Sequence, residues 1–227
     1  MINRRNFLIK SVKAGIIPGL SSFLSLPLIG GTALIPYFSQ EAEGFQSVAP
    51  PHSANPQRPG TVLDRLVPHI HPELDLHNPN TREFFRGAYY DPLSGYDVEA
   101  IKALNWFWRD WRQGVARQVD VRLFWALSAI RQAAMKEGHS GRMMLNSGYR
   151  TPATNDMLSV EGAAHHSMHL AARASDIVLP NVPTEVLYRF ALFLGIGGVG
   201  HYPNRFVHID SGPGRTWLGL GRRIGGI

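Results

Sequence analysis

The sequence predicts an α+β fold, and three observations support this class. Two segments with apolar residues at helical spacing come first, at 98–111 and 121–134. Short apolar runs of strand length follow and are mixed with helical segments, without a regular βαβ alternation. The chain has 227 residues and is 44% hydrophobic, which suits one globular domain with tails.

The first 40 residues predict an export signal. Arg4 and Arg5 precede a mildly apolar run from Ala14 to about Phe38. This order of charged and apolar segments is typical of signal peptides, and the paired arginines resemble the twin-arginine export signal. We therefore expect the twin-arginine translocation machinery to deliver the protein to the periplasm. An uncleaved N-terminal anchor is the alternative, because the run is about long enough to span a membrane.

The charge distribution argues against a nucleic-acid partner. The formal net charge is +6, but four basic residues and no acidic residue lie in the first 40 positions. The remaining 19 basic and 17 acidic residues leave a net charge of only +2. The absence of cysteine excludes disulfides and cysteine metal ligands.

A proline-rich linker is predicted at 41–72, because the segment has turn and polyproline chemistry and little apolar content. A hairpin is expected at 73–90. Leu74 and Leu76 alternate there with polar residues before the turn at 78–80.

Capping residues bound the two predicted helices. Asp97 begins the first helix, which Gly114 ends, and Asp120 begins the second, which Gly138 ends. Trp108 and Trp111 share the apolar face of the first helix, so we expect them in the core and not as a sugar-stacking platform.

The second half of the chain alternates strands with short helices. Pro152 begins a helix, and Gly195 ends a later one that starts near Val186. The expected strands are 142–149, 174–179, 199–202 and 206–210.

Three side chains in this half form a candidate metal site. His169, Asp176 and His208 supply two imidazoles and a carboxylate, a ligand set that suits zinc and leaves one position for water. Alternation along 206–210 places His208 and Asp210 on one face of a strand. Histidines near loops are common, so spacing alone leaves a core or surface role open.

Longer motifs carry a family resemblance. The stretches SGYRTPATN, SMHLAARASDIVLP and GGVGHYPNRFVHIDSGPGRTW resemble the murein endopeptidase K family of zinc peptidases. This family shares the fold of lysostaphin, D-Ala-D-Ala peptidases and sonic hedgehog. The resemblance covers about 74–217. It implies a zinc peptidase-like domain at 73–217 with a small antiparallel sheet carrying the zinc site, packed with helices, and a Gly/Arg-rich tail at 218–227.

The same resemblance implies roles for individual residues. His169, Asp176 and His208 would bind Zn²⁺, and Arg150 would bind substrate or a reaction intermediate. Ser167 is a further candidate for substrate binding, or a simple loop hydroxyl. The implied reaction is hydrolysis of a peptide bond in the cross-linked peptide stems of peptidoglycan.

The general base departs from the family pattern. Many relatives place Glu or His two or three residues before the third ligand, where this chain has Phe206 and Arg205. Asp210 and His201 are the catalytic candidates that remain. Asp210 has an alternative role in orienting an imidazole.

Two other functions stay open. A D,D- or L,D-carboxypeptidase acting on muropeptides uses similar ligands. A non-catalytic zinc-containing cell-wall-binding module is the second alternative, because the usual base is missing.

Overall fold

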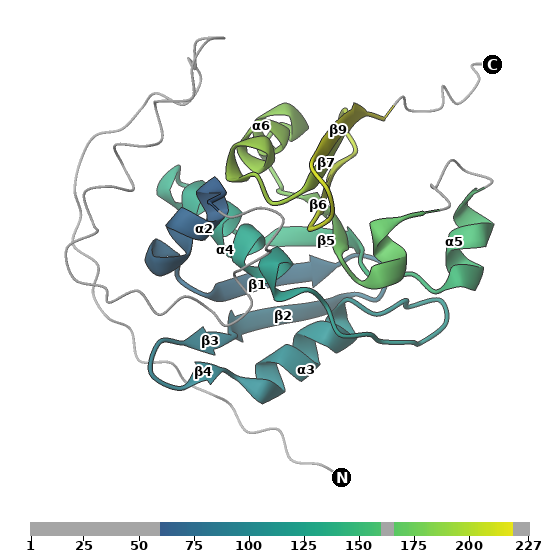
Figure 1. Ribbon diagram of the computed structural model, residues 1–227, viewed down its shortest axis with the longest axis horizontal. Coiled ribbons are helices and arrows are strands. Elements are labelled where there is room, and N and C mark those ends of the chain that lie inside the picture. The colour runs from purple at the N-terminus through teal and green to yellow at the C-terminus, as the bar shows by residue number, and fades with distance from the viewer. Residues whose placement is uncertain (1–59, 160–165, 220–227) are drawn as a thin grey trace.

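A seven-stranded sheet forms the centre of the protein in the computed structural model (Figure 1), which describes residues 60–159 and 166–219. Its strand order is β2-β1-β5-β6-β8-β7-β9. The strands are β1 (Glu73–Asn78), β2 (Glu83–Ala88), β5 (Met143–Ser147), β6 (Ala174–Val178), β7 (Gly198–Tyr202), β8 (Phe206–Asp210) and β9 (Arg215–Leu218). A separate pair comprises β3 (Tyr90–Asp91) and β4 (Gly95–Tyr96). The predicted export segment, most of the predicted linker and most of the predicted tail lie outside the described residues.

The sheet is mixed, which corrects the expectation of an antiparallel one. β1 pairs with β5 in parallel, and β7 pairs with β9 in parallel, while the other neighbours are antiparallel. The two long helices between β2 and β5 return the chain so that β5 can run alongside β1. The α+β class and the hairpin at 73–90 are confirmed.

Helices cover the sheet unequally. The longer ones are α3 (Val98–Phe107), α4 (Val121–Lys136), α5 (Pro152–Ser159) and α6 (Thr184–Leu194). The short ones are α2 (Val62–Leu66), η1 (Val67–His69) and η2 (Met168–Ala171). α4 packs on β1, α6 packs on β7 and β8, and the two helices contact each other, so they cover the same face. α3 packs on β2, at the other end of the sheet from α6 (Figure 1).

The folded domain begins earlier than predicted, inside the segment assigned to the linker. Thr61 caps α2, and its hydroxyl and backbone exchange hydrogen bonds with Asp64. Asp64 also pairs with Arg122 of α4 at 2.6 Å. Leu63 is only 1% exposed, so α2 belongs to the core. The apolar residues here are too few to show a helical period, which is why composition alone suggested a linker.

α3 ends one turn earlier than its apolar pattern suggested. The Trp108 amide makes the last helical bond, to Leu104, and the chain then turns. Asp110 accepts hydrogen bonds from the amide and hydroxyl of Thr151, which tie this turn to the start of α5. As a result Trp108 is fully buried, as predicted, whereas Trp111 is 37% exposed, contrary to prediction.

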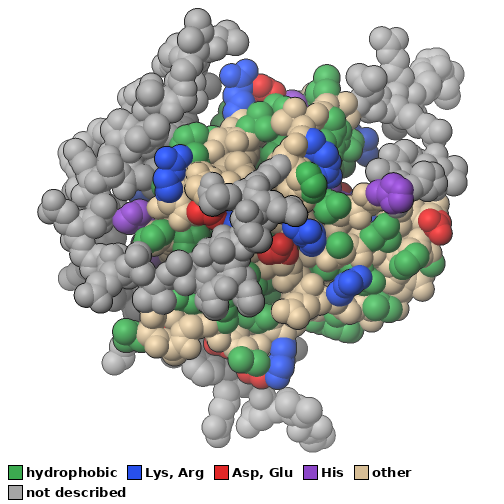
Figure 2. All heavy atoms as spheres, in the orientation of Figure 1, with side chains coloured by type: hydrophobic (Ala, Val, Ile, Leu, Met, Phe, Trp, Pro, Cys, Tyr) green, Lys and Arg blue, Asp and Glu red, His purple; other side chains and the backbone are tan. Residues whose placement is uncertain are grey.

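The described surface has a mixed character. On the face seen in Figure 2, Lys and Arg side chains lie scattered among apolar and neutral atoms, several of them beside Asp or Glu. Within residues 60–159 and 166–219, no helix combines the length and apolarity needed to cross a membrane.

Candidate metal centre

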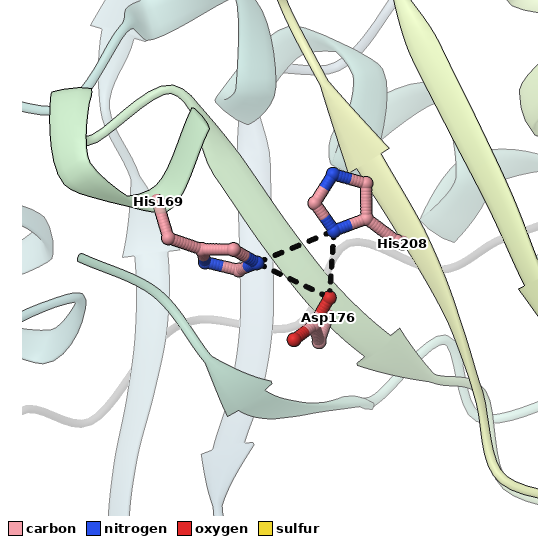
Figure 3. Close-up of side chains that lie close together, drawn as sticks. All are labelled: His169, Asp176 and His208. Atoms are coloured by element: carbon pink, nitrogen blue, oxygen red, sulfur yellow. Dashed lines mark hydrogen bonds and ion pairs between the residues drawn. The ribbon is translucent and has the colours of Figure 1, made fainter. Parts of the chain in front are cut away.

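Three buried side chains meet at one point of the sheet. His169 Nε2 lies 3.2 Å from His208 Nδ1 and 3.3 Å from Asp176 Oδ1, and the last two atoms are 2.8 Å apart (Figure 3). The ligand atoms of a tetrahedral zinc ion are about 3.3 Å from one another when the bonds are about 2.0 Å long. The donor types and the spacing therefore fit zinc. In the described part of the chain, no other group of three His, Cys, Asp or Glu side chains comes together this way.

Strand register places two of the three donors. Asp176 of β6 lies directly opposite His208 of β8, and residues in that relation point to the same side of a sheet. Val207 and Ile209 point to the other side, where both are fully buried under the helices. The predicted alternation along this strand is confirmed.

The register extends this alignment into a row across five strands. The row, which we call the cross-sheet row, consists of Ser147, Asp176, His208, Gly200 and Trp217, each opposite the next. Two of the three candidate metal ligands, Asp176 and His208, are adjacent members of this row.

The third donor comes from the short helix η2. The Ser167 hydroxyl accepts a hydrogen bond from the His169 amide, which caps η2 at its start. His169 Nδ1 lies 2.5 Å from the Gly148 carbonyl oxygen. A carbonyl only accepts, so Nδ1 carries the proton and the Nε2 lone pair faces the cluster. Burial lowers the pKa of His169, which favours this neutral form. Ser167, predicted to bind substrate, is placed here as a helix cap.

Asp210 holds the far side of the His208 ring. His208 Nε2 donates to Asp210 Oδ2 at 3.1 Å, and Nδ1 faces the cluster and donates to Asp176 Oδ1 at 2.8 Å. Asp210 is fully buried. It also accepts hydrogen bonds from the Gly198 and Gly212 amides and from Nη1 and Nη2 of Arg215. Burial opposes the ionisation of Asp210, but the hydrogen bonds from His208 and Arg215 outweigh this effect and lower the pKa of Asp210 to about 2. Every oxygen of this carboxylate is occupied, which suits orientation of a ligand and not proton abstraction.

Arg150 contacts the cluster directly. Its Nη2 donates to Asp176 Oδ2 at 2.7 Å, and its Nε donates to the Ser147 hydroxyl at 2.8 Å. The pKa of Asp176 lies well below its usual value: burial opposes ionisation, but the interactions with His169 and His208 outweigh it. Arg150 thus fixes the second oxygen of Asp176 and turns the first toward the two imidazoles.

The backbone of the SGYRT segment also supports the site. Gly148 approaches Trp108 so closely that an added Cβ would lie 2.5 Å from the Trp108 carbonyl oxygen. The Tyr149 amide donates to that same oxygen at 2.7 Å. Glycine is therefore required where the chain passes Trp108 to present its carbonyl to His169. Sequence reasoning identified Arg150 in this motif but missed Gly148, whose only signal was its place between two polar site residues.

His201 does not join the cluster. It lies opposite Val207, so its ring points to the helix-covered face of the sheet. There it contacts Thr184 at 3.0 Å and Glu185 at 3.2 Å, and it stacks on Tyr188. The catalytic role predicted for His201 has no geometric support, because odd and even positions of a strand face opposite sides.

Comparison with known proteins adds the family. Residues 69–217 match the family described as peptidoglycan L,D-endopeptidase MepK. The peptidoglycan L,D-endopeptidases MepK of Escherichia coli K12 and Shigella flexneri are each 35% identical over 147 residues, which is 63% of this chain and 79% of theirs. The probable peptidoglycan L,D-endopeptidase MepK of Haemophilus influenzae is 31% identical over 150 residues, 65% of this chain and 79% of its own. With a family match over most of the folded domain and relatives above 30% identity, this chain belongs to the MepK family.

Proposed function

We propose that this protein is an exported, zinc-dependent endopeptidase that hydrolyses peptide cross-links of peptidoglycan. The observation that carries the proposal is the buried His169–Asp176–His208 cluster, whose donor atoms have the spacing of a zinc site in a member of this family. Zinc held there would lower the pKa of a bound water and polarise a peptide carbonyl.

The protein's own residues prepare that site. His169 offers Nε2 and His208 offers Nδ1, and each ring is fixed through its other nitrogen. Arg150 neutralises one oxygen of Asp176. Its side chain is 13% exposed, so it also presents positive charge to a substrate carboxylate or a developing oxyanion.

The non-catalytic binding module is the second candidate function. Arg205 and Phe206 occupy the positions where many members of the family that the sequence resembles carry the general base. Neither side chain can accept a proton. Asp210 does not replace it, since its oxygens are all engaged.

Digestion of cross-linked muropeptide dimers by the purified protein lacking residues 1–40 tests the proposal. We expect the protein to release monomers only when zinc is present. The variant His208→Ala should lose this activity, whereas His71→Ala, which changes an exposed histidine and serves as the control, should keep it. The bond cut, read by mass spectrometry, separates endopeptidase from carboxypeptidase action. Zinc-loaded protein that binds muropeptides without cutting any of them would support the binding module instead.

Export is tested separately. A reporter that is active only if it is exported in its folded state can be fused to residues 1–40, and we expect it to reach the periplasm. The double variant Arg4→Lys, Arg5→Lys keeps the charge and should block this export. A reporter that crosses equally well in cells without the twin-arginine machinery would contradict this part of the proposal. A mature protein of unreduced mass that stays with the membrane would indicate an anchor.

A further inference from the structure

The cross-sheet row is chemically asymmetric about the metal cluster. On the β5 side, Ser147 and Arg150 supply a hydroxyl and a guanidinium. On the β7–β9 side, the row continues with Gly200 and Trp217. A peptide lying across the cluster would therefore meet polar groups on one side of the scissile bond and an aromatic surface on the other.

Trp217 reaches the cluster through a notch at Gly200. An added Cβ on Gly200 would lie 2.6 Å from the indole Nε1, so only glycine leaves room for the ring. The indole centroid is 5.0 Å from that of His208, and Nε1 donates to the Tyr202 hydroxyl at 3.1 Å. The ring is thus fixed at the edge of the candidate metal site.

Neighbouring aromatic rings extend this surface. Tyr202 and Phe206 are opposite each other and stack at 4.2 Å, on the same face of the sheet as Trp217. All three side chains are only half-buried. Arg205 lies over the Phe206 ring and adds positive charge at the rim.

We propose that Trp217, Tyr202 and Phe206 form a subsite for the aliphatic side chain of the stem-peptide residue next to the scissile bond. The inference deepens the proposed endopeptidase function and rests on it. Residues of an extended peptide are about 3.4 Å apart, so a side chain on Trp217 belongs to a residue adjacent to the bond at the metal. Trp217 is thus a specificity-determining residue.

Kinetics on a sugar-free, cross-linked peptide dimer test the subsite. We expect Trp217→Ala to raise KM about tenfold, the effect of losing about 55 Å² of apolar contact, with little change in kcat. Trp217→Phe should recover part of the loss. Gly200→Ala should mimic Trp217→Ala, because the new methyl displaces the indole. Phe84→Ala, an exposed aromatic on β2 at the opposite edge of the sheet, is the matched control and should leave KM unchanged.

Zinc affinity and peptide binding separate this role from a supporting one. We expect zinc affinity of Trp217→Ala to stay within about threefold of wild type, whereas loss of a ligand-supporting group costs about 10- to 100-fold. A large loss of zinc affinity would make Trp217 a positioning residue for His208 and overturn the subsite. An unchanged KM in folded Trp217→Ala, or a defect seen only with sugar-bearing muropeptides, would overturn it as well.

Calorimetric binding of the same dimer to metal-free protein distinguishes this inference from the proposed function. Wild-type protein that binds the dimer more tightly than Trp217→Ala, but does not cleave it when loaded with zinc, would retain the subsite and refute the endopeptidase. Wild-type cleavage with equal binding by both proteins would refute only the subsite. Trp217→Phe serves for both measurements if Trp217→Ala fails to fold.

Discussion

Asp210 lies two positions from His208 and contacts the ring nitrogen that faces away from the cluster. Its carboxylate receives two amides, a guanidinium and the His208 ring, so its geometry is fixed from several directions. Groups of this kind set the tautomer and orientation of a metal-binding imidazole.

Replacing Asp210 by Asn should therefore weaken zinc binding about 10- to 100-fold. Chelator competition measures the affinity, and turnover at saturating zinc should be largely retained. Asp91→Asn, an exposed carboxylate in the β3–β4 turn, is the control. Full zinc occupancy with turnover abolished would instead identify Asp210 as the general base.

The sequence predicted which residues gather at the site better than it predicted what each one does. The residue types and the family resemblance named His169, Asp176 and His208, and the structure brings them together. The ion pair between Arg150 and Asp176 joins positions 26 apart through strand pairing, which no local pattern reveals. The face of His201 was readable in principle, since pairing the last two predicted strands puts it opposite Val207.

Among the elements, the close contact between Trp108 and the segment after β5 matters most for the geometry of the candidate site. Trp108 is fully buried, and its indole donates to Ser175 on β6. The same residue supports the turn that presents the Gly148 carbonyl. Helix periodicity predicted that Trp108 is buried, but the contact with Gly148 depends on where α3 ends, and that point was wrongly predicted.

Gly148→Ala should damage both stability and metal binding. The new methyl cannot fit beside Trp108, so the segment must move and withdraw its carbonyl from His169. We expect about 1–3 kcal/mol of lost stability, measured by denaturant unfolding, and weaker zinc affinity. Gly87→Ala is the matched control, because its added methyl meets only Phe85 at 3.9 Å. Equal behaviour of the two variants would contradict the close approach.

The attachment of the segment after α3 to the sheet should depend on pH. Arg109 pairs with both oxygens of Glu83 on β2, at 2.9 and 3.0 Å, and this bond lowers the pKa of Glu83 below its usual value of 4.5. A carboxylate whose pKa is lowered in the folded state stabilises the protein at pH values above its unfolded-state pKa. This stabilisation disappears as the pH falls through the folded-state pKa.

Glu83→Gln should thus cost less than about 1 kcal/mol near neutral pH, because the pair is partly exposed. The difference from wild type should vanish in acid. Denaturant unfolding at pH 7 and pH 3 measures it, and a difference that grows toward acid pH would contradict the assignment.

At the scale of the whole molecule, the segment before β1 belongs to the same core as the sheet. Buried apolar side chains of this segment join the main core; they are Leu63, Leu66, Val67 and Ile70. Composition could not reveal this, because five helical residues beside a proline-rich stretch carry no periodic signal.

A chain that starts at Glu73 should therefore fail to fold, while one that starts at Gly60 should fold. Losing a buried Leu or Ile side chain costs about 2–5 kcal/mol, and total stability is only about 5–15 kcal/mol. Thermal unfolding followed by circular dichroism compares the two chains. Equal melting temperatures would show that α2 is dispensable.

The cross-sheet row also makes ion binding a test of strand pairing. A slip of one residue between β6 and β8 would turn Asp176 or His208 toward the helix-covered face. Only the correctly paired sheet then offers all three donors, so zinc bound there would favour that arrangement over misaligned ones and would link strands that are distant in sequence. Amide hydrogen exchange should slow most in β6 and β8 when zinc is added.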